Sequence, residues 1–341
     1  MSAKIRVHNT DFKLRGCLDY AHHSWNLHRN PKTAELKPIA DFFRGRCQRL
    51  RSLMQLPAQV GNVALKMRDV YNRSVVEVTG AFNTDSLTAD QAKKIEIRSN
   101  EIFAQMADET LRLQQGPDWD NHVHQRLIDG LVAVELMGKD VSSVGAIQAS
   151  MMSYLTTGWT IIETMSGDLW ETALNVHPSS LANLTGSPKR LKGGQINQSV
   201  STSRDSKTVR LDEISRHGFD VANRMGTILR GKFEFSSLDG IREAYASAFD
   251  KGATEIDRAL TDKSLDALSA IRNVIVHRDA QADDEYVKKT KFLATIPRVA
   301  TGEYLLFDGE TVVRLLKPAI ASANQLLLAV DNWLVKAVSK T

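Results

Sequence analysis

Apolar residues recur every three or four positions over much of the chain, which is the period of an α-helix with one buried face. The pattern begins near Glu35 and continues to Phe82, where the loop NTDS interrupts it. Further helices are predicted over residues 88–115 and 120–137. Thr88 and Gln91 have capping-box spacing, in which each side chain can bond the other's free backbone amide. Residues 35–138 therefore predict long antiparallel helices, in a bundle or a hairpin.

The second half of the chain continues the helical pattern. Helices are expected over residues 142–176, 211–229, 238–249, 264–277 and 310–338. Between the last two, residues 291–309 alternate in polarity, which is typical of a short hairpin or an extended segment. Only 8 prolines occur in 341 residues, and long stretches lack glycine as well. We predict an all-α protein with a helical N-terminal region at 1–140 and a second helical domain at 141–341.

Composition narrows the class of protein. The hydrophobic fraction of 42% and the charged fraction of 25% are those of a globular domain. No window approaches the roughly 20 apolar residues of a membrane helix, and the N-terminus lacks the apolar run of a signal peptide. Two cysteines, Cys17 and Cys47, do not make a disulfide scaffold, so a reducing cytoplasm is the expected location. The net charge of +4 permits an acidic partner such as nucleic acid without requiring one.

Residues 185–210 differ in composition from their surroundings, being rich in Gly, Ser, Asn and Gln. The segment contains one acidic residue, Asp205, and six basic ones: Lys189, Arg190, Lys192, Arg204, Lys207 and Arg210. This basic loop could cover RNA phosphates, or it could be a solvated linker. It has no interleaved aromatic residues, so stacking of single-stranded bases is not indicated.

A metal site finds little support in the sequence. His22, His23 and His28 lie near Cys17, but their spacing fits no usual zinc pattern, and no second cysteine completes the set. The segment GSPKRLKGG lacks the full sequence of a phosphate-binding loop. We therefore predict neither a metal nor a cofactor.

The stretch LDALSAIRNVIVHRDAQADDEYVKK, residues 265–289, holds the main candidate site. At about 100° per residue, Leu268, Ile271 and Ile275 share one face of a helix, and Asn273 and His277 lie on the other, one turn apart. Arg272 lies between the two faces, and its long side chain can swing toward His277. Spacing alone is typical of an ordinary solvated helix face, because an arginine followed five residues later by a histidine is common.

Such a trio suits cleavage of a phosphodiester without a metal. Histidine titrates near neutral pH, so His277 could take a proton from a ribose 2′-hydroxyl or give one to a leaving oxygen. Arg272 could bind the phosphate oxygens where negative charge develops, and Asn273 could orient either partner. One trio holds one acid–base group, so two copies facing each other across a two-fold axis would ease the second proton transfer.

The same stretch resembles the signature of the HEPN superfamily, helical domains of prokaryotic toxins and RNA-cleaving defence factors. The family motif is an Arg, often followed by a polar residue, and a His after four to six further residues. Arg272, Asn273 and His277 match it, and the upstream GWTIIETMSGDLWETAL, with Glu163, resembles the long first helix of such domains. The resemblance covers roughly residues 145–338 and leaves the N-terminal region without a family.

This resemblance implies a metal-independent endoribonuclease that leaves 2′,3′-cyclic phosphate and 5′-hydroxyl ends. His277 would be the acid–base catalyst, Arg272 the phosphate clamp, Asn273 the orienting group and Glu163 a carboxylate that could hold Arg272. It also implies a homodimer with facing Arg–His helices, and a role as a toxin or phage-defence effector, restrained in many systems by an antitoxin or other partner protein.

Two alternatives stay open from the sequence. The domain could be a non-catalytic module that binds RNA or a nucleotide, or a helical scaffold with Arg272 and His277 as surface residues. The N-terminal helices could bind a partner, sense a trigger or extend the dimer interface. The RNA target, the trigger and any antitoxin are not decided by the sequence.

Overall fold

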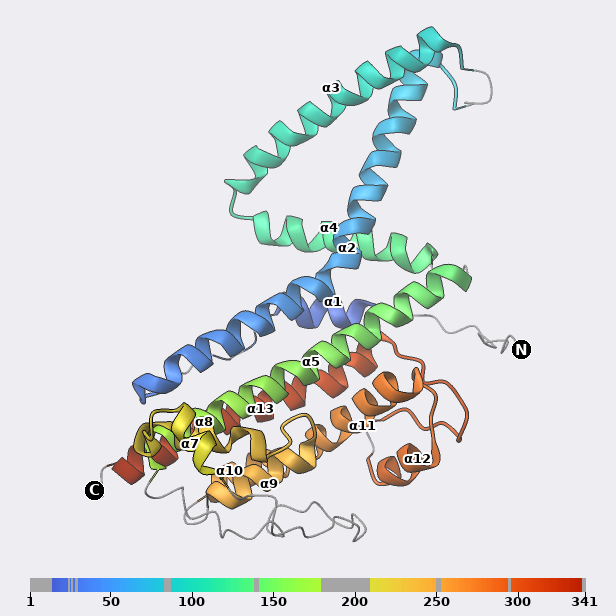
Figure 1. Cartoon of the computed structure of the whole chain (residues 1–341). Coiled ribbons are helices and arrows are strands. Elements are labelled where there is room, and N and C mark those ends of the chain that lie inside the picture. Colours follow the sequence, from blue (N-terminus) through green and yellow to red (C-terminus); the bar gives the residue numbers. More distant parts are fainter. Residues whose placement is uncertain are drawn as a thin grey trace. The chain divides into compact units, whose positions relative to one another are not determined.

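The computed structural model describes residues 14–23, 25, 27, 30–82, 87–137, 141–178, 209–249, 253–293 and 296–338. Within these ranges the fold is all-α, as predicted, and one isolated antiparallel bridge joins Gln281 to Tyr304 (Figure 1). The helices are α1 Arg15–His22, η1 Ala34–Leu36, α2 Lys37–Thr79, α3 Ala89–Gln114, α4 Trp119–Met137, α5 Val141–Val176, α7 Leu211–Arg216, α8 Val221–Leu229, η4 Arg230–Lys232, α9 Leu238–Ala248, α10 Thr254–Leu260, α11 Lys263–Arg278, α12 Asp284–Thr290 and α13 Gly309–Val338.

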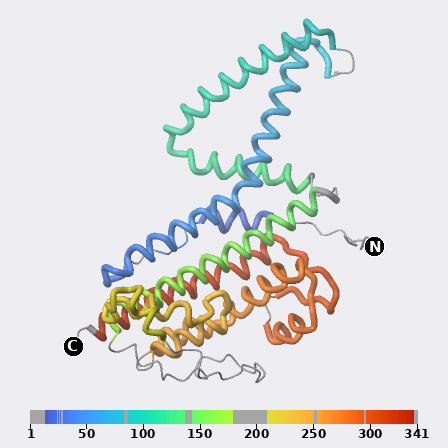
Figure 2. Tube along the Cα trace, viewed as in Figure 1, coloured from blue at the N-terminus to red at the C-terminus, as the bar shows by residue number. Residues whose placement is uncertain are grey.

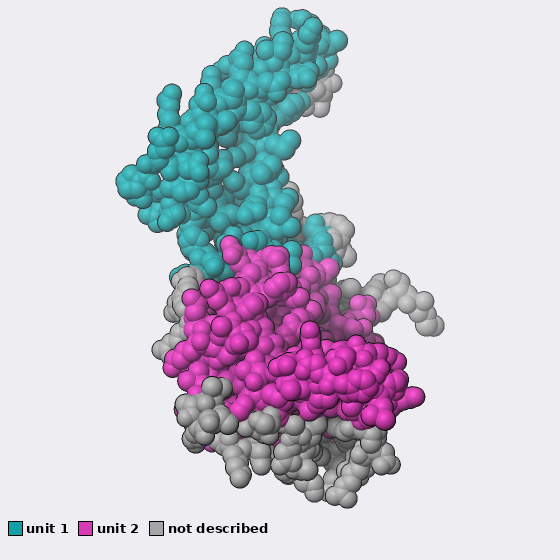
Figure 3. All heavy atoms as spheres, turned by 60° about the vertical axis from the view of Figure 1, so that its left-hand side comes forward, with its two compact units in different colours: residues 1–23, 51–148, 308–310 teal, residues 24–50, 149–307, 311–341 magenta. Residues whose placement is uncertain are grey.

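The chain divides into two compact units (Figure 3). Unit 1 comprises residues 1–23, 51–148 and 308–310, and unit 2 comprises residues 24–50, 149–307 and 311–341. The sequence analysis set one boundary near residue 140. The structure differs in assigning residues 24–50, which include the first part of α2, to unit 2.

In unit 1, α4 crosses α2 at a pair of glycines. A Cβ added at Gly130 would lie 2.0 Å from the carbonyl oxygen of Ala58, and one at Gly61 would lie 2.0 Å from the carbonyl oxygen of Gly130. The two backbones can approach this closely only because neither glycine carries a side chain. At the start of α3 the predicted capping box of Thr88 and Gln91 is confirmed.

In unit 2, the core is built around α5, α13 and the first part of α2. Gly158 of α5 lies against two buried leucines, Leu316 of α13 and Leu50 of α2. Figure 2 shows α5 and α13 running alongside each other through this unit. Asp331 of α13, itself buried, accepts hydrogen bonds of 2.8 Å from the backbone amides of Lys32 and Thr33. This carboxylate therefore fixes the segment that leads into α2.

The C-terminal half of α5 is covered by α8 and α9. The indole N–H of Trp170 donates to the carbonyl oxygen of Ala244 at 2.9 Å, and the Tyr245 hydroxyl donates to the carbonyl oxygen of Ser166 at 2.8 Å. All of these contacts are buried, so α9 is held against α5 by directional bonds as well as by apolar packing.

The predicted single helix over 211–229 is two helices in the structure. Gly218 and Phe219 adopt positive φ values of 64° and 58°, which ends α7, and the side chain of Asp220 then caps α8 by accepting from the amide of Asn223. A glycine after a helix and an aspartate before the next are common signals for an end and a start.

Three short helices, α1, α10 and α12, were not expected from the periodicity, which predicted no helix before Glu35. Residues 291–309 do not form a hairpin with each other, and the alternative of an extended segment holds for the part described. This segment bonds instead to the turn after α11, where Leu305 donates to the carbonyl oxygen of Ala280 and Ala282 donates to that of Glu303, both at 2.9 Å.

Candidate functional site

The candidate site is on α11, which the sequence pattern predicted over residues 264–277. Asp262 caps its first turn by accepting from the amide of Ser264 at 2.8 Å. Leu268 and Ile271 are buried, as the helical period predicts, and Ile275, the third residue of the predicted stripe, is half-buried. Val274 is also buried, whereas Val276 is 52% exposed.

An ion pair between the buried Arg242 of α9 and the half-buried Asp266 holds the N-terminal half of α11 to α9. Arg242 of α9 donates through Nη1 and Nη2 to the two carboxylate oxygens of Asp266, at 2.7 Å and 3.0 Å, and through Nε to the carbonyl oxygen of Leu260. The Arg242 side chain is only 4% exposed. No local pattern in the sequence indicated this pair, because the partners are 24 residues apart and lie on different helices.

The polar face of α11 carries the three predicted site residues. Asn273 and His277 are exposed, and Arg272 is half-buried. Nη1 of Arg272 donates to the Oδ1 atom of Asn273 at 3.1 Å. His277 lies one turn further along, on the side that Asn273 faces. A ligand can therefore reach all three side chains from solvent.

Glu163 of α5, the fourth predicted residue, lies near Arg272. Burial raises the pKa of the half-buried Glu163 carboxyl, and the positive charge of Arg272 acts in the opposite direction. A weaker lowering effect comes from the indole N–H of Trp159. The structure thus brings Glu163 and Arg272 within electrostatic reach of each other, although they are 109 positions apart in the sequence.

Trp159 of α5 is buried. Its Nε1 atom makes no hydrogen bond of normal geometry with any described residue, so its effect on Glu163 operates over a longer distance. The spacing of Trp159 and Glu163, one turn apart on α5, was the signal in the sequence that could have linked them.

The C-terminal end of α11 is fixed by an unusual turn. Asp279 and Ala280 have φ values of 50° and 62°, and the amide of Ala280 donates back to the carbonyl oxygen of Val274 at 3.2 Å. The next residue after His277, Arg278, pairs with Asp283 at 3.2 Å. Of the two arginines on this part of α11, Arg272 is thus the one directed toward Asn273 and Glu163.

Most of the basic loop, residues 185–210, lies outside the residues that the structure describes. Lys189, Arg190, Lys192, Arg204 and Lys207 lie outside the described residues.

Arg210, the last predicted residue of that loop, is described and exposed. Its Nε atom lies 3.0 Å from a carboxylate oxygen of Asp212, and its backbone amide donates to Glu213. In this position Arg210 precedes α7 and is paired with an acidic neighbour.

The histidines near the N-terminus do not form a metal site with the other described residues. In the described part of the chain, no group of three or more His, Cys, Asp and Glu side chains is arranged to hold a metal ion. The His22 ring instead lies against that of His124, with centroids 4.4 Å apart. Burial lowers the pKa of His22, and the neighbouring His124 and His23 lower it further. His28 lies outside the described residues.

Comparisons with protein-family models, with curated proteins and with solved structures found no match for this chain. Of the helices described, none combines the length and the apolar character needed to cross a lipid bilayer.

Proposed function

We propose that this protein is a metal-independent endoribonuclease of the HEPN type that acts as a dimer. The observation that carries the proposal is the arrangement around Arg272, which is bonded to Asn273, lies near Glu163 and shares an exposed helix face with His277. An always-charged group, an amide and an imidazole are together on one accessible surface. A carboxylate from another helix, that of Glu163, lies within electrostatic reach of the cation.

The proposed reaction needs no group beyond those side chains. His277 takes the proton from a ribose 2′-hydroxyl, and the 2′-oxygen attacks the adjacent phosphorus. Arg272 donates to the non-bridging oxygens, where negative charge is greatest in the transition state. The bond to the 5′-oxygen breaks and that oxygen takes up a proton, which leaves a 2′,3′-cyclic phosphate and a 5′-hydroxyl. No water is consumed in this step.

The second proton transfer favours two copies of the site. In each chain His277 supplies one imidazole on this face, and after the first step it is protonated. A second copy of α11 facing the first would supply another imidazole to protonate the leaving oxygen. A toxin or defence role and restraint by an antitoxin are parts of the proposal that rest on the family resemblance alone. The dimer rests on this resemblance and on the second proton transfer, and the cytoplasmic location rests on the small number of cysteines.

Within this proposal Glu163 is a positioning residue. It lies near Arg272, and its carboxylate limits the directions in which the guanidinium can point. Glu163→Gln keeps the shape and removes the charge. We expect a lower kcat with KM little changed, because the arginine would still bind phosphate but would be less well directed in the transition state.

Purified protein should cleave transfer RNA or total RNA in the presence of EDTA. We expect Arg272→Ala and His277→Ala to lose cleavage, and the products of the wild-type enzyme to carry cyclic phosphates. Arg258→Ala on α10 and His217→Ala after α7 are matched controls, since they remove the same chemical groups elsewhere in unit 2.

The outcomes separate the competing functions. Equal cleavage by all variants would refute the proposed site. RNA binding without cleavage, unchanged in His277→Ala, would favour the non-catalytic binding module. Absence of both binding and cleavage, with normal growth when the protein is overproduced, would favour the scaffold protein.

A further inference from the structure

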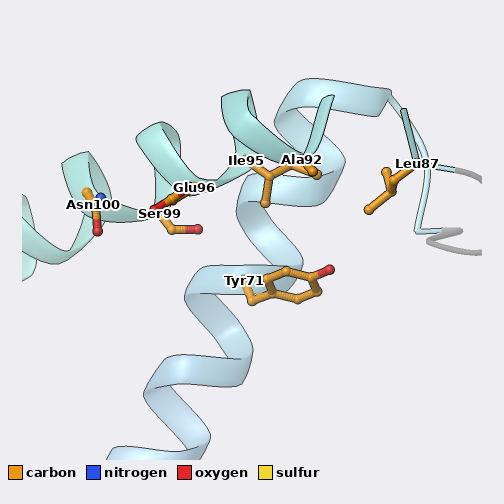
Figure 4. Close-up of a pocket in the computed structure, with 7 residues that line it drawn as sticks. All are labelled: Tyr71, Leu87, Ala92, Ile95, Glu96, Ser99 and Asn100. Carbon is orange, nitrogen blue, oxygen red and sulfur yellow. The ribbon is translucent and has the colours of Figure 1, made fainter. Parts of the chain in front are cut away.

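A hollow lies between α2 and α3 in unit 1 (Figure 4). Its volume of about 310 Å³ is at the lower end of the range for sites that bind small molecules. One lining residue comes from α2, and the others come from α3 and the segment before it: Tyr71, Leu87, Ala92, Ile95, Glu96, Ser99 and Asn100. All of them belong to unit 1, so the hollow is formed within a single unit.

The walls of the hollow are held by directional bonds. The hydroxyl of Ser99 on α3 donates to that of Ser74 on α2 at 3.0 Å. Arg98 of α3 also pairs with Glu77 of α2. The capping box at the start of α3 orders the backbone next to Leu87. A ligand therefore meets walls that are already ordered, which lowers the entropic cost of binding.

The lining of the hollow is mainly apolar. Ile95 is buried and Leu87 is half-buried, whereas Tyr71 is 43% exposed, which leaves part of its ring open to a ligand. Figure 4 shows the Tyr71 side chain extending from α2 toward the part of α3 that carries Ala92 and Ile95. The apolar part of a ligand can thus leave water by packing on these side chains.

The polar groups of the lining can all accept a hydrogen bond. Glu96 supplies the only formal charge among the lining residues, and Asn100 lies one turn further along the same face of α3. The side chains of Tyr71, Glu96 and Asn100 make no hydrogen bond or ion pair with a described residue. Lys93, the basic residue three positions before Glu96, does not line the hollow and is not paired with that carboxylate. One negative charge and several acceptors therefore remain for a ligand.

We propose that the hollow binds a small organic ammonium ion, that is, a protonated amine carried on an apolar body. The ammonium group donates to the Glu96 carboxylate and to the side-chain oxygen of Asn100. The π face of the Tyr71 ring attracts the same positive charge, and the apolar body packs on Ile95 and Leu87. An anion of equal size is repelled by Glu96, and a neutral ligand lacks the charge-assisted hydrogen bond.

One probe and two molecules of nearly the same shape test the ligand class in the full-length chain. Phenethylamine carries an ammonium group at neutral pH, 2-phenylethanol is neutral and phenylacetate is an anion. We expect phenethylamine to bind with a Kd of about 1 mM, as suits a ligand of this size, and 2-phenylethanol to bind about tenfold more weakly. Phenylacetate should not bind in the same concentration range.

The methyl signals of two isoleucines report where the probe binds. Ile95 lines the hollow, whereas Ile97 of the same helix is 52% exposed and lies outside it. In a chain labelled at its isoleucine methyl groups, the NMR signal of Ile95 should shift as phenethylamine is added, and that of Ile97 should not. Ile95→Val and Ile97→Val assign the two signals.

Two substitutions test the residues that recognise the ammonium group. Glu96→Gln keeps the size of the side chain and removes its charge, which should weaken phenethylamine binding about tenfold. Asp108→Asn is the matched control, because Asp108 is an exposed acid of α3 outside the hollow and its loss changes the net charge equally. Tyr71→Leu should weaken binding about threefold through loss of the aromatic ring. Circular dichroism confirms that each variant is folded.

Three results would overturn the proposal. An Ile95 signal that stays in place up to about 50 mM phenethylamine would refute the site. Equal affinities for phenethylamine and phenylacetate would refute the ligand class, and equal affinities of the wild type and Glu96→Gln would refute recognition by charge.

A further probe distinguishes a free amine from a lysine side chain of a partner protein. Nα-acetyl-lysine amide presents the same ammonium group on a bare methylene stem and should bind more weakly than phenethylamine, whereas tighter binding would overturn the choice of a free amine. None of these readouts involves RNA or α11. Failure of this proposal is thus distinguishable from failure of the proposed ribonuclease function.

Discussion

Replacing Gly130 by alanine should separate α4 from α2 and destabilise unit 1. The added Cβ would lie 2.0 Å from the carbonyl oxygen of Ala58 and 2.4 Å from the amide nitrogen of Asn62. Ordinary contacts of a Cβ begin near 3.4 Å, so the helices must move apart by more than 1 Å. Both opposing atoms belong to the backbone of a long helix, and no rotation of a side chain can relieve the overlap.

Two opposing contributions set the magnitude. Overpacking in a well-packed contact typically costs about 1–3 kcal/mol, and the upper part of this range applies where the backbone has to shift. Alanine is favoured over glycine within a helix by about 0.8–1.0 kcal/mol. The net effect should therefore be a loss of about 1–2 kcal/mol in the free energy of unfolding of unit 1.

Gly145 provides the matched control. It is in α5, also within unit 1, is exposed, and an added Cβ there would meet nothing within 4 Å. Gly145→Ala should leave the packing unchanged and gain helix propensity, which stabilises by about 0.5–1 kcal/mol. The same chemical change is thus expected to have opposite signs at the two positions.

Urea unfolding followed by circular dichroism gives the two free energies, and hydrogen exchange over residues 119–137 localises the effect to α4. Gly61→Ala should behave like Gly130→Ala, and the double variant should cost less than the sum, because one separation of the helices relieves both overlaps. A Gly130→Ala protein as stable as the wild type would refute the close approach, and equal losses at Gly130 and Gly145 would point to a general effect of alanine.

Three further predictions concern unit 2. Asp331→Ala should lower the free energy of unfolding by about 2 kcal/mol, because two backbone amides lose their buried acceptor. Urea unfolding measures this loss, and an unchanged midpoint would contradict the role of Asp331 as that acceptor. Asp266→Ala should cost about 3–5 kcal/mol, because the buried guanidinium of Arg242 would lose its carboxylate, and replacing both residues by apolar ones should recover much of that loss. Because the pKa of Glu163 is raised, the native state binds that proton more tightly than the unfolded chain, so the contribution of Glu163 to stability falls as pH rises from the ordinary carboxyl pKa through the raised one. Glu163→Gln should remove this part of the pH dependence, and an identical pH profile in the variant would show that the carboxyl titrates normally.

The local pattern of the sequence was sufficient to predict the positions of most of the helices. The period of the apolar residues and the capping box at Thr88 placed α3, α4, α5, α11 and α13 within a few residues of their ends. The division of polar and apolar faces on α11 was also readable, because it depends only on the helix period. Helix periodicity and capping are local properties, so they can be read without knowing what a helix packs against.

The same pattern did not show which apolar faces are buried. Val63, Met67 and Tyr71 continue the helical spacing of the residues before them, yet they are exposed, while Val75 further along is buried. The difference arises because α3 lies against α2 at Ser74, next to Val75, where Ser99 donates to Ser74, whereas α4 meets the opposite face of α2 at Ala58 and Gly61. Burial is a property of the partner surface, and no partner can be identified from the period of one helix.

Only the tertiary structure decided how the candidate site is assembled. The sequence showed that Asn273 and His277 share a helix face with Arg272 at its edge, and the family resemblance offered Glu163 as a carboxylate that could hold Arg272. That Glu163 lies near Arg272, and that Arg242 anchors α11 through Asp266, depends on how α5, α9 and α11 pack. Side chains on one helix are related by its fixed geometry, whereas those on different helices are related only by the packing of the whole unit.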